Sequence, residues 1–505
     1  MSFETLHPLY RAEQVGELDR RTIAGGIEGF ALMQRASAAA WQVLRDRFPE
    51  VRSLTVLCGA GNNGGDGHVL AALAAAEGLA VQRILLKGID ELGGDARLAA
   101  DMATAAGVGV EPWTSGMTFT GELLVDALLG TGLSGEVRGA FLDAITAINA
   151  SARPVLAIDI PSGLHADTGA VLGKAVRAAA TVTFIGDKLG LHTGAAADHV
   201  GERHFCALGV DAAAQADLMP AARLLEESLI AAWLPPRRRA AHKGDCGHSL
   251  ILGGAPGFGG AALLAAETCA RLGAGKVSLA TAPEHVVASL VRCPEVMVHG
   301  VRGAADLGEL PSGADVLVVG PGLGQGSWGQ GVLQAALDAE RPLVVDADGL
   351  NLLATRFSKS QRAGWILTPH PGEAARLLGC SAAEVEADRP AAALALRERW
   401  GGVVVLKGAG TLVAGPSGLV VCPFGNPGMA SGGMGDALSG MLGALLAQGV
   451  PLEIAAWLGV LTHALAADLA ARDAGERGLL AGDLASYARM LVNPTMGGDD
   501  AAATR

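Results

Sequence analysis

An aspartate at the end of a glycine-rich segment is the strongest chemical signal in the sequence. Asp436 ends GNPGMASGGMGD (425–436), and the apolar residues that follow it are spaced as on one face of a helix. The helix would begin at the glycine turn 432–435, whose N–H groups can stabilise a phosphoryl group during transfer. Asp436 could take a proton from an attacking hydroxyl, although an ordinary helix-capping aspartate would give the same local pattern.

Three further segments of the second half could complete such a site. KGAGT (407–411) follows an apolar run and offers a lysine to a phosphate and a threonine to a hydrogen bond. GPGLG (320–324) also follows an apolar run and would let the backbone approach a ligand closely. TPHPGE (368–373) fixes His370 between two prolines, where a buried structural histidine is the alternative to a ligand contact.

Polar side chains accompany three strand-like runs of the first half. Asn62, Asn63 and Asp66 follow the first run, Asp126 lies in the second, and Asp159 follows the third. Because the carboxyl ends of parallel strands meet at one edge of a sheet, we expect these groups to converge on a ligand site. For each aspartate taken alone, a structural role in holding a loop is the alternative.

A cation and a phosphate could both bind at this edge. Asn63, Asp126 and Ser162 offer oxygen ligands to a hard cation, and the lack of a cage of several carboxylates favours a monovalent ion over calcium. The segment GTGLSGE (130–136) could wrap a phosphate with its backbone amides.

The segment CGAGNNGGDGH (58–68) contains the GxGxxG pattern of dinucleotide-binding loops. It lies between an apolar run (53–58) and a stretch of helical spacing (68–78), as a phosphate-binding turn would. A dehydrogenase needs an acid at the end of the next strand to bind the ribose, but VQRILL (81–86) is followed by Lys87. The sequence therefore argues against a hydride-transferring dehydrogenase.

Apolar runs that end in glycine loops alternate with helical stretches along the chain. These runs are apolar on both faces, which is typical of strands in a buried parallel sheet. The alternation predicts an α/β fold with helices on both faces of each sheet. It lapses between about 211 and 240, where the sequence is alanine-rich and contains Pro-Pro-Arg-Arg-Arg. We place the boundary there, which gives domains of residues 1–221 and 222–505.

Composition limits the partners and the compartment. The net charge of −13 disfavours nucleic acid or an anionic membrane as a partner. The seven cysteines include no C-x-x-C pair, and the N-terminus has charges where a signal peptide needs an apolar stretch. The longest apolar candidate, near 453–471, is interrupted by His463 and Asp468. We expect a cytoplasmic protein with no nucleic-acid or membrane partner.

Motifs of the first half resemble the NAD(P)H-hydrate epimerase domain across nearly all of residues 10–210. They are LMQRAS (32–37), NNGGDG (62–67), Asp126 with GTGLSGE, DIPSG (159–163) with Asp167–Thr168–Gly169, and the segment that begins at Lys188. The resemblance implies a Rossmann-like, three-layer α/β/α domain that binds hydrated NADH or NADPH, with potassium at Asn63, Asp126 and Ser162. The implied substrate contacts are Asn62, Asn63, Gly64, Gly65, Asp66, Gly130, Thr131, Gly132, Leu133, Ser134, Gly135, Glu136, Phe141 and Asp159. The family often has a tyrosine where Phe141 stands, so one hydrogen bond of the family is missing here.

The reaction implied for this domain needs one acidic group. The hydrated ring has a hydroxyl on the carbon beside the ring nitrogen. The nitrogen lone pair can expel the protonated hydroxyl, and water can return on the other face. A carboxyl that donates and recovers a proton suffices; Asp159 is the first candidate, with Lys188 as an electrostatic partner. A ring-opening route is the alternative.

The second half resembles the ribokinase-like superfamily and, within it, the ADP-dependent NAD(P)H-hydrate dehydratase over about 240–490. The motifs are HKGDCGHSLILGGAPGFGGA (242–261), GPGLG, VDADGLN (345–351), TPHPGE, KGAGT and NPGMASGGMGD. A second three-layer α/β/α domain is implied, in which Asp436 deprotonates the ring hydroxyl for phosphoryl transfer from ADP. Mg²⁺ is also expected, although the sequence shows no obvious ligand for it. The implied substrate contacts are Ala261, Gly322, Gly324, His370 and Asp436, and the implied ADP contacts are Lys407, Gly408, Ala409, Gly410, Thr411 and Gly435.

The two resemblances together predict a bifunctional nicotinamide-nucleotide repair enzyme. The first half would interconvert the R and S hydrates, and the second would dehydrate the S form to NAD(P)H, giving AMP and phosphate from ADP. We also expect a homo-oligomer. The alternative is a small-alcohol kinase of the ribokinase superfamily fused to a non-catalytic binding domain. TPHPGE with KGAGT disfavours the kinase, and the intact polar residues of the first half disfavour the inactive domain.

Overall fold

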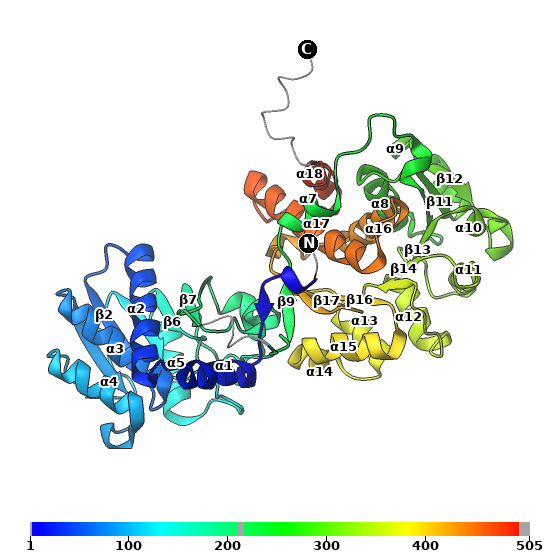
Figure 1. Cartoon of the computed structure of the whole chain (residues 1–505). Helices are drawn as coiled ribbons and strands as arrows, with labels where there is room; N and C mark the ends of the chain where they lie inside the picture. The colour runs from blue at the N-terminus through cyan, green and yellow to red at the C-terminus, as the bar shows by residue number, and fades with distance from the viewer. Residues whose placement is uncertain (1–2, 211–216, 494–505) are drawn as a thin grey trace, which may run out of the picture. The chain divides into compact units, whose positions relative to one another are not determined.

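The computed structural model describes residues 3–210 and 217–493 and divides the chain into two compact units (Figure 1). Pro8–Ala222 form one unit, here called the N-terminal unit. The chain from Arg223 onward forms the C-terminal unit together with the segment that ends at His7. Part of the stretch without alternating pattern, residues 211–216, lies outside the described residues.

A parallel sheet forms the middle layer of the N-terminal unit. Its order among the described residues is β4-β3-β2-β5-β6-β7-β8, and each neighbouring pair is parallel. The strands are β2 (Ser53–Cys58), β3 (Ala80–Leu85), β4 (Glu111–Pro112), β5 (Leu123–Ala127), β6 (Val155–Ile158), β7 (Ala180–Phe184) and β8 (Glu202–Cys206). The short strand β1 (Pro8–Leu9) lies where the chain enters this unit.

Helices cover both faces of this sheet. Neighbouring residues of a strand point to opposite faces, and the strands here are buried on both. Val56 of β2 belongs to a core cluster with residues of four helices, whereas Leu57 belongs to a second cluster with residues of a fifth. The four helices are α1 (Ala12–Ala24), α2 (Gly29–Arg47), α3 (Asn62–Ala76) and α4 (Gly94–Ala105), and the fifth is α5 (Gly139–Ala150). The predicted α/β class is confirmed in this unit.

The C-terminal unit has a larger mixed sheet. From β9 its order among the described residues is β9-β18-β17-β16-β15-β14-β13-β10-β11-β12. Only β17 runs antiparallel to its two neighbours. The strands are β9 (Ala222–Leu224), β10 (His248–Leu252), β11 (Lys276–Thr281), β12 (Met297–Gly300), β13 (Val316–Val319), β14 (Leu343–Val345), β15 (Trp365–Leu367), β16 (Val403–Leu406), β17 (Thr411–Gly415) and β18 (Gly418–Cys422).

Helices again pack on both faces of the sheet (Figure 1). The main core lies between one face and α8 (Gly259–Arg271), α16 (Met434–Ala447), α17 (Leu452–Ala474) and α18 (Leu484–Leu491). The other face carries α11 (Ser327–Asp338), α12 (Ala347–Arg356), α13 (Pro371–Leu378) and α15 (Arg389–Trp400). By length and composition α17 could cross a membrane, but 78% of its most apolar window is buried within the protein.

The first described residues of the chain pack into the C-terminal unit. Leu6 is 1% exposed and belongs to the main core of that unit. The ring of Phe3 lies 6.1 Å from that of Trp457 in α17, and the Arg223 guanidinium lies 5.1 Å from the Phe3 ring centre. Arg223 also donates a hydrogen bond to the carbonyl of Leu6 at 2.6 Å. An N-terminal segment is therefore part of the C-terminal core.

Candidate active sites

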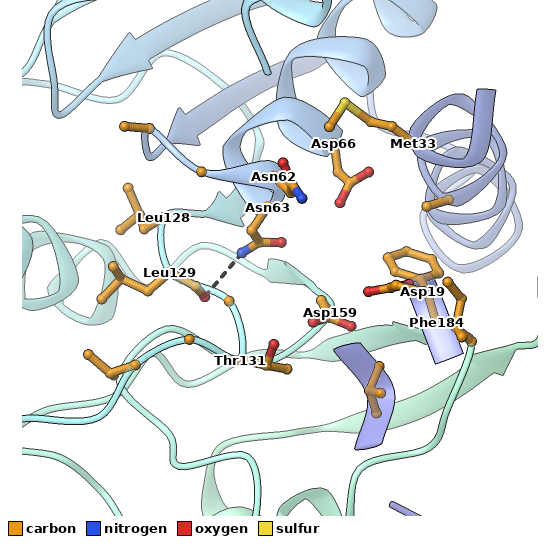
Figure 2. Close-up of a pocket in the computed structure, with 18 of the residues that line it drawn as sticks. Asp19, Met33, Asn62, Asn63, Asp66, Leu128, Leu129, Thr131, Asp159 and Phe184 are labelled. Atoms are coloured by element: carbon orange, nitrogen blue, oxygen red, sulfur yellow. Dashed lines mark hydrogen bonds between the residues drawn. The ribbon is translucent and has the colours of Figure 1, made fainter. Parts of the chain in front are cut away.

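A pocket of ≈ 860 Å³ opens at the carboxyl ends of the strands in the N-terminal unit (Figure 2). This volume is in the range of small-molecule sites. The pocket brings together the three polar segments that the sequence places after different strands. Of the predicted site residues its lining includes Asn62, Asn63, Asp66, all of Gly130 to Glu136, Phe141, Asp159 and Lys188.

The glycine segment of this site is helical. The sequence predicts helical spacing from 68, but α3 begins at Asn62 with Gly61 as its N-cap, so the predicted helix start is six residues too late. A side chain on Gly64 would collide with the carbonyl of Gly59, and one on Gly65 with Met33. These glycines therefore permit close packing behind the pocket, and they are not in its lining.

Asp159 and Lys188 form an ion pair in the pocket wall. The Lys188 ammonium donates to the Asp159 carboxylate, to Thr183 Oγ1 at 2.9 Å and to the carbonyl of Phe184 at 3.1 Å. Lys188 is 1% exposed, while Asp159 still reaches the pocket. Asp159 also has a φ of 67°, a left-handed conformation that is costly for a residue with a Cβ. Residues in such conformations are found preferentially at functional sites.

The predicted cation ligands lie together around the loop after β5. Asp126 accepts hydrogen bonds from the Ser162 hydroxyl at 2.6 Å and the Ser162 N–H at 2.8 Å. Leu129 donates its N–H to Ser162 Oγ and accepts from Asn63 Nδ2 at 3.1 Å. Asn63 Oδ1 is buried and has no hydrogen-bond partner among the described residues. An unpaired buried carbonyl oxygen fits a cation ligand, because leaving it bare is costly.

Two acids of the pocket differ from Asp159 in their partners. Asp66, on α3, accepts from the Ser37 hydroxyl at 3.5 Å and forms no ion pair among the described residues. Burial raises the pKa of Asp66 well above its ordinary value, and the charge of Asp159 adds to the rise. Asp19 of α1 also lines the pocket, and burial raises its pKa too. The sequence analysis missed Asp19, because nothing separates it from the other charged residues of an amphipathic helix.

A buried ion pair lies beneath the candidate site of the C-terminal unit. Lys407, which follows β16, donates to Asp346, which follows β14, at 2.8 Å. Asp346 is 1% exposed and accepts a second hydrogen bond from Ser439 of α16 at 2.8 Å. Burial alone would raise the pKa of Asp346, but Lys407 and Ser439 hold it below its ordinary value. Glu373 lies 3.9 Å from the Lys407 ammonium, so two carboxylates face one lysine.

Asp436 lies directly above this pair, in the first turn of α16. Gly433 is the N-cap of the helix with a φ of 92°, as the predicted glycine turn requires. A side chain on Gly435 would come within 3.1 Å of the Lys407 ammonium and 3.4 Å of Asp346. Burial, together with the charges of Asp346 and Glu373 and against the opposing charge of Lys407, raises the pKa of Asp436 to about 7. A carboxyl of this pKa is well suited to act as a base near neutral pH.

The remaining predicted contacts surround the same sheet edge. His370 is the N-cap of α13, where its Nδ1 accepts from the N–H of Gly372 at 3.0 Å. Its side chain is 52% exposed, so it is not a buried core histidine. The GPGLG loop is joined to the loop after β10 by a hydrogen bond from Ala255 to the carbonyl of Gly322 at 2.7 Å. Gly324 donates to Asp348 at 2.9 Å, and Ala261 lies in the first turn of α8.

Hydrogen bonds from neighbouring side chains hold the loop 407–411, which is predicted to bind ADP. Arg389, 1% exposed, donates to the carbonyl of Lys407 at 3.2 Å, and Thr411 donates to the carbonyl of Gly408 at 2.9 Å. Gly408 and Ala409 remain exposed at the end of β16. Asp346, Glu373 and Arg389 are the site residues that the sequence analysis did not single out. Asp346 and Glu373 stand inside the quoted motifs VDADGLN and TPHPGE, so the motifs held a signal for both.

Comparisons with known proteins identify the family of each half of the chain. Residues 249–489 match the family described as NAD(P)H-hydrate dehydratase, and residues 29–190 match the family described as YjeF-related protein N-terminus. The chain is 49% identical over 487 residues to the bifunctional NAD(P)H-hydrate repair enzyme Nnr of Coxiella burnetii, covering 96% of this chain and 99% of that relative. It is 44% identical to the enzyme of the same name from Escherichia coli, covering 97% and 94%. A solved ribokinase-like superfamily protein from Enterococcus faecalis is 27% identical, with a TM-score of 0.50, and covers 54% of this chain and 96% of that one. The predicted ribokinase-like fold of the second half is confirmed.

Proposed function

We infer the roles of the residues from one premise: the chain belongs to the family of bifunctional NAD(P)H-hydrate repair enzymes. It has an epimerase domain followed by an ADP-dependent dehydratase domain. The full-length similarity disfavours a small-alcohol kinase fused to an inactive domain. The observation that carries our assignment of the chemistry is Asp436, an acid of pKa about 7 at the start of a helix and next to a lysine that is paired with the buried Asp346.

In the dehydratase domain we assign Asp436 as the base. It takes the proton of the ring hydroxyl, whose oxygen attacks the terminal phosphorus of ADP, and AMP leaves. The N–H groups at the start of α16 face the phosphoryl group in transfer. The ring nitrogen then expels phosphate from the neighbouring carbon, and loss of a proton from the next ring carbon neutralises the ring cation and restores NAD(P)H. Ala261, Gly322, Gly324 and His370 would contact the hydrated nucleotide, and residues 407–411 with Gly435 would contact ADP.

Mg²⁺ in this domain would be held mainly through the phosphate oxygens of ADP. The described residues contain no group of three or more acidic, histidine or cysteine side chains placed to hold a metal ion. Magnesium commonly binds through one or two carboxylates together with substrate phosphates, so this arrangement fits it. Bound there, it would offset the charge of the phosphates.

In the epimerase domain the pocket would bind the hydrated ring beside Asp159 and Lys188. The phosphates would lie against the backbone of Gly130 to Glu136, and Asn62 and Asn63 would hold the nucleotide from α3. Expulsion of the hydroxyl leaves positive charge on the ring, which an ionised carboxylate stabilises. Water then returns on either face and gives both hands of the hydrate.

We also propose potassium at Asn63, Asp126 and Ser162. The unpaired Asn63 Oδ1 supports this, as does a ligand set that has only one carboxylate. The ion would hold the loop after β5 in place beneath the substrate. A cytoplasmic location and a homo-oligomeric state are further proposals, which fractionation and light scattering would test.

Incubation of acid-hydrated NADH with the protein, followed by chromatography, tests the proposed function. Without ADP, a single purified epimer should equilibrate with the other, and no NADH should form. With ADP, both epimers should disappear while NADH, AMP and phosphate form in equal amounts. NADH formation without ADP, or ADP consumption without AMP, would show that the assigned reaction is wrong.

A further inference from the structure

Three carboxyl groups face the same space in the epimerase pocket. Figure 2 shows the side chains of Asp19, Asp66 and Asp159 directed into the pocket from α1, from α3 and from the loop after β6. Only one lysine among the described lining residues pairs with them: Lys188, which is bonded to Asp159. The lining also contains Asp95, Glu136 and Lys87, and Lys87 pairs with Glu91 instead. Three acids beside one paired lysine are costly to ionise together, because like charges in a partly buried site repel.

Asp159 is bonded to a buried ammonium group. The Lys188 ammonium is buried and has two other acceptors among the described residues, Thr183 Oγ1 and the carbonyl of Phe184. If Asp159 took up a proton, Lys188 would keep its charge with no anion beside it, and an unpaired buried charge is costly. The sequence suggests Asp159 as the proton donor, but its ion pair with Lys188 suits Asp159 better to the role of a negatively charged group that stabilises the ring cation.

The surroundings of Asp66 favour its neutral form, because burial raises its pKa. Its side-chain partner is the Ser37 hydroxyl, which offers one weak hydrogen bond and no charge. It is the fifth residue of α3, so it lies beyond the first turn in which free N–H groups favour an anion. The charges of Asp159 and Asp19 both raise the pKa of Asp66, in addition to its burial.

We propose that Asp66 is the proton donor of epimerisation and that Asp159 is the fixed anion that stabilises the ring cation. The proposal rests on the epimerase function and divides two tasks between two carboxyls. Two acids whose surroundings drive their protonation states apart are a common arrangement in acid–base catalysis.

Each bond change in this scheme is balanced. Asp66 gives its proton to the ring hydroxyl, and the carbon–oxygen bond breaks as the ring nitrogen lone pair forms a carbon–nitrogen double bond. Water leaves, and the ring carries the positive charge opposite Asp159. Water then adds to the same carbon from the other face, and the double-bond electrons return to nitrogen. The proton released by that water returns to the carboxylate of Asp66.

The kinetic test compares Asp66→Asn, Asp19→Asn and wild type on one purified epimer without ADP. We expect Asp66→Asn to lose about 100-fold or more of kcat with KM little changed, since general acids contribute about 10²–10⁴-fold. Wild-type epimerisation should fall as pH rises, because the donor loses its proton. ADP-dependent dehydration of the S epimer reports on the dehydratase domain alone, so thermal unfolding of the variant followed by circular dichroism should also match wild type to show that the epimerase domain is folded. If wild type epimerises and Asp66→Asn does so at a comparable rate, the proposal is wrong while the proposed function stands; if wild type does not epimerise, the function itself fails.

An infrared measurement without substrate tests the protonation states directly. The difference spectrum between wild type and Asp66→Asn at pH 7 should contain the carbonyl band of a protonated carboxyl. The difference between wild type and Asp159→Asn should contain the carboxylate bands of Asp159. A protonated-carboxyl band that vanishes in Asp159→Asn or Asp19→Asn and persists in Asp66→Asn would overturn the proposal, even if Asp66→Asn were inactive.

Discussion

The pKa of Asp436, which depends on the charges of its neighbours, should determine how the rate of dehydration changes with pH. Because Asp436 has a pKa of about 7 and acts as a base, only its ionised form is active. At two pH units below this pKa about one molecule in a hundred is ionised, so kcat/KM should be about 100-fold lower at about pH 5 than on its plateau above neutrality. ADP also titrates in this range, with a phosphate pKa of about 6, so the wild-type profile alone does not identify the group.

Two substitutions beneath Asp436 should move this profile in opposite directions. Asp346→Asn removes a negative charge that raises the pKa of Asp436, so the acid limb should move to lower pH by about one unit or more. Lys407→Met removes a positive charge that lowers it, so the limb should move to higher pH. Both variants should also be slower at the plateau, since each loses half of the buried pair.

The assay is the initial rate of NADH formation from the pure S epimer, at saturating ADP and Mg²⁺, between pH 5 and 9. Asp338→Asn, an exposed aspartate of α11, removes the same charge elsewhere in the domain and should leave the limb in place. If the acid limbs of Asp346→Asn and Lys407→Met moved in the same direction, or if neither moved, Asp436 would be refuted as the titrating base.

Three further predictions concern the other features of the chain. Asp436→Asn should lower dehydration by about 10²–10⁴-fold and leave epimerisation unchanged, which chromatography of each reaction measures; near-normal dehydration would contradict the assignment. Asp159→Asn should block epimerisation only, so an equal mixture of hydrates with ADP should stop near half conversion apart from slow spontaneous epimerisation, whereas prompt complete consumption would mean that Asp159 is not needed. Leu6→Ala should destabilise the C-terminal unit by about 2–5 kcal/mol, as deletions in a core do, measured by urea unfolding followed through dehydratase activity. Leu480→Ala, at a leucine that is 62% exposed, is its control and should cost less than about 0.5 kcal/mol; equal effects would show that the Leu6 contact contributes nothing special.

The sheets were predictable because their strands are buried on both faces. The run 53–58 coincides with β2, and the apolar runs before Asp159 and Lys407 are strands β6 and β16. The start of α3 was missed because glycines usually mark loops, whereas here they allow a helix to pack closely against its neighbours. Local sequence statistics do not report that packing requirement.

The sites were predictable only where a motif held the residue. Asp436 and Asn63 stand in quoted motifs, but the partner of Lys407 is 61 residues away in the chain. Such a pair depends on which strands lie side by side, and one sequence does not give that order. The protonation of Asp66 is less predictable still, since it depends on charges that α1 and β6 bring to it.

Because residues 3–7 belong to the C-terminal unit, they affect both the order in which the domains can fold and the way the gene can be divided. A ribosome releases Phe3 and Leu6 before the epimerase domain, but the core that receives them is complete only after α17 and the last strands have been made. This apolar end must therefore wait while about two hundred residues of the epimerase domain emerge and fold. A gene cut between codons 222 and 223 would give one product with an uncovered apolar surface and another with an apolar tail. If the two activities were encoded by separate genes, other residues would have to bury the surface of the dehydratase core that Phe3 and Leu6 now occupy. A single cut in the gene is therefore not enough to separate the two domains.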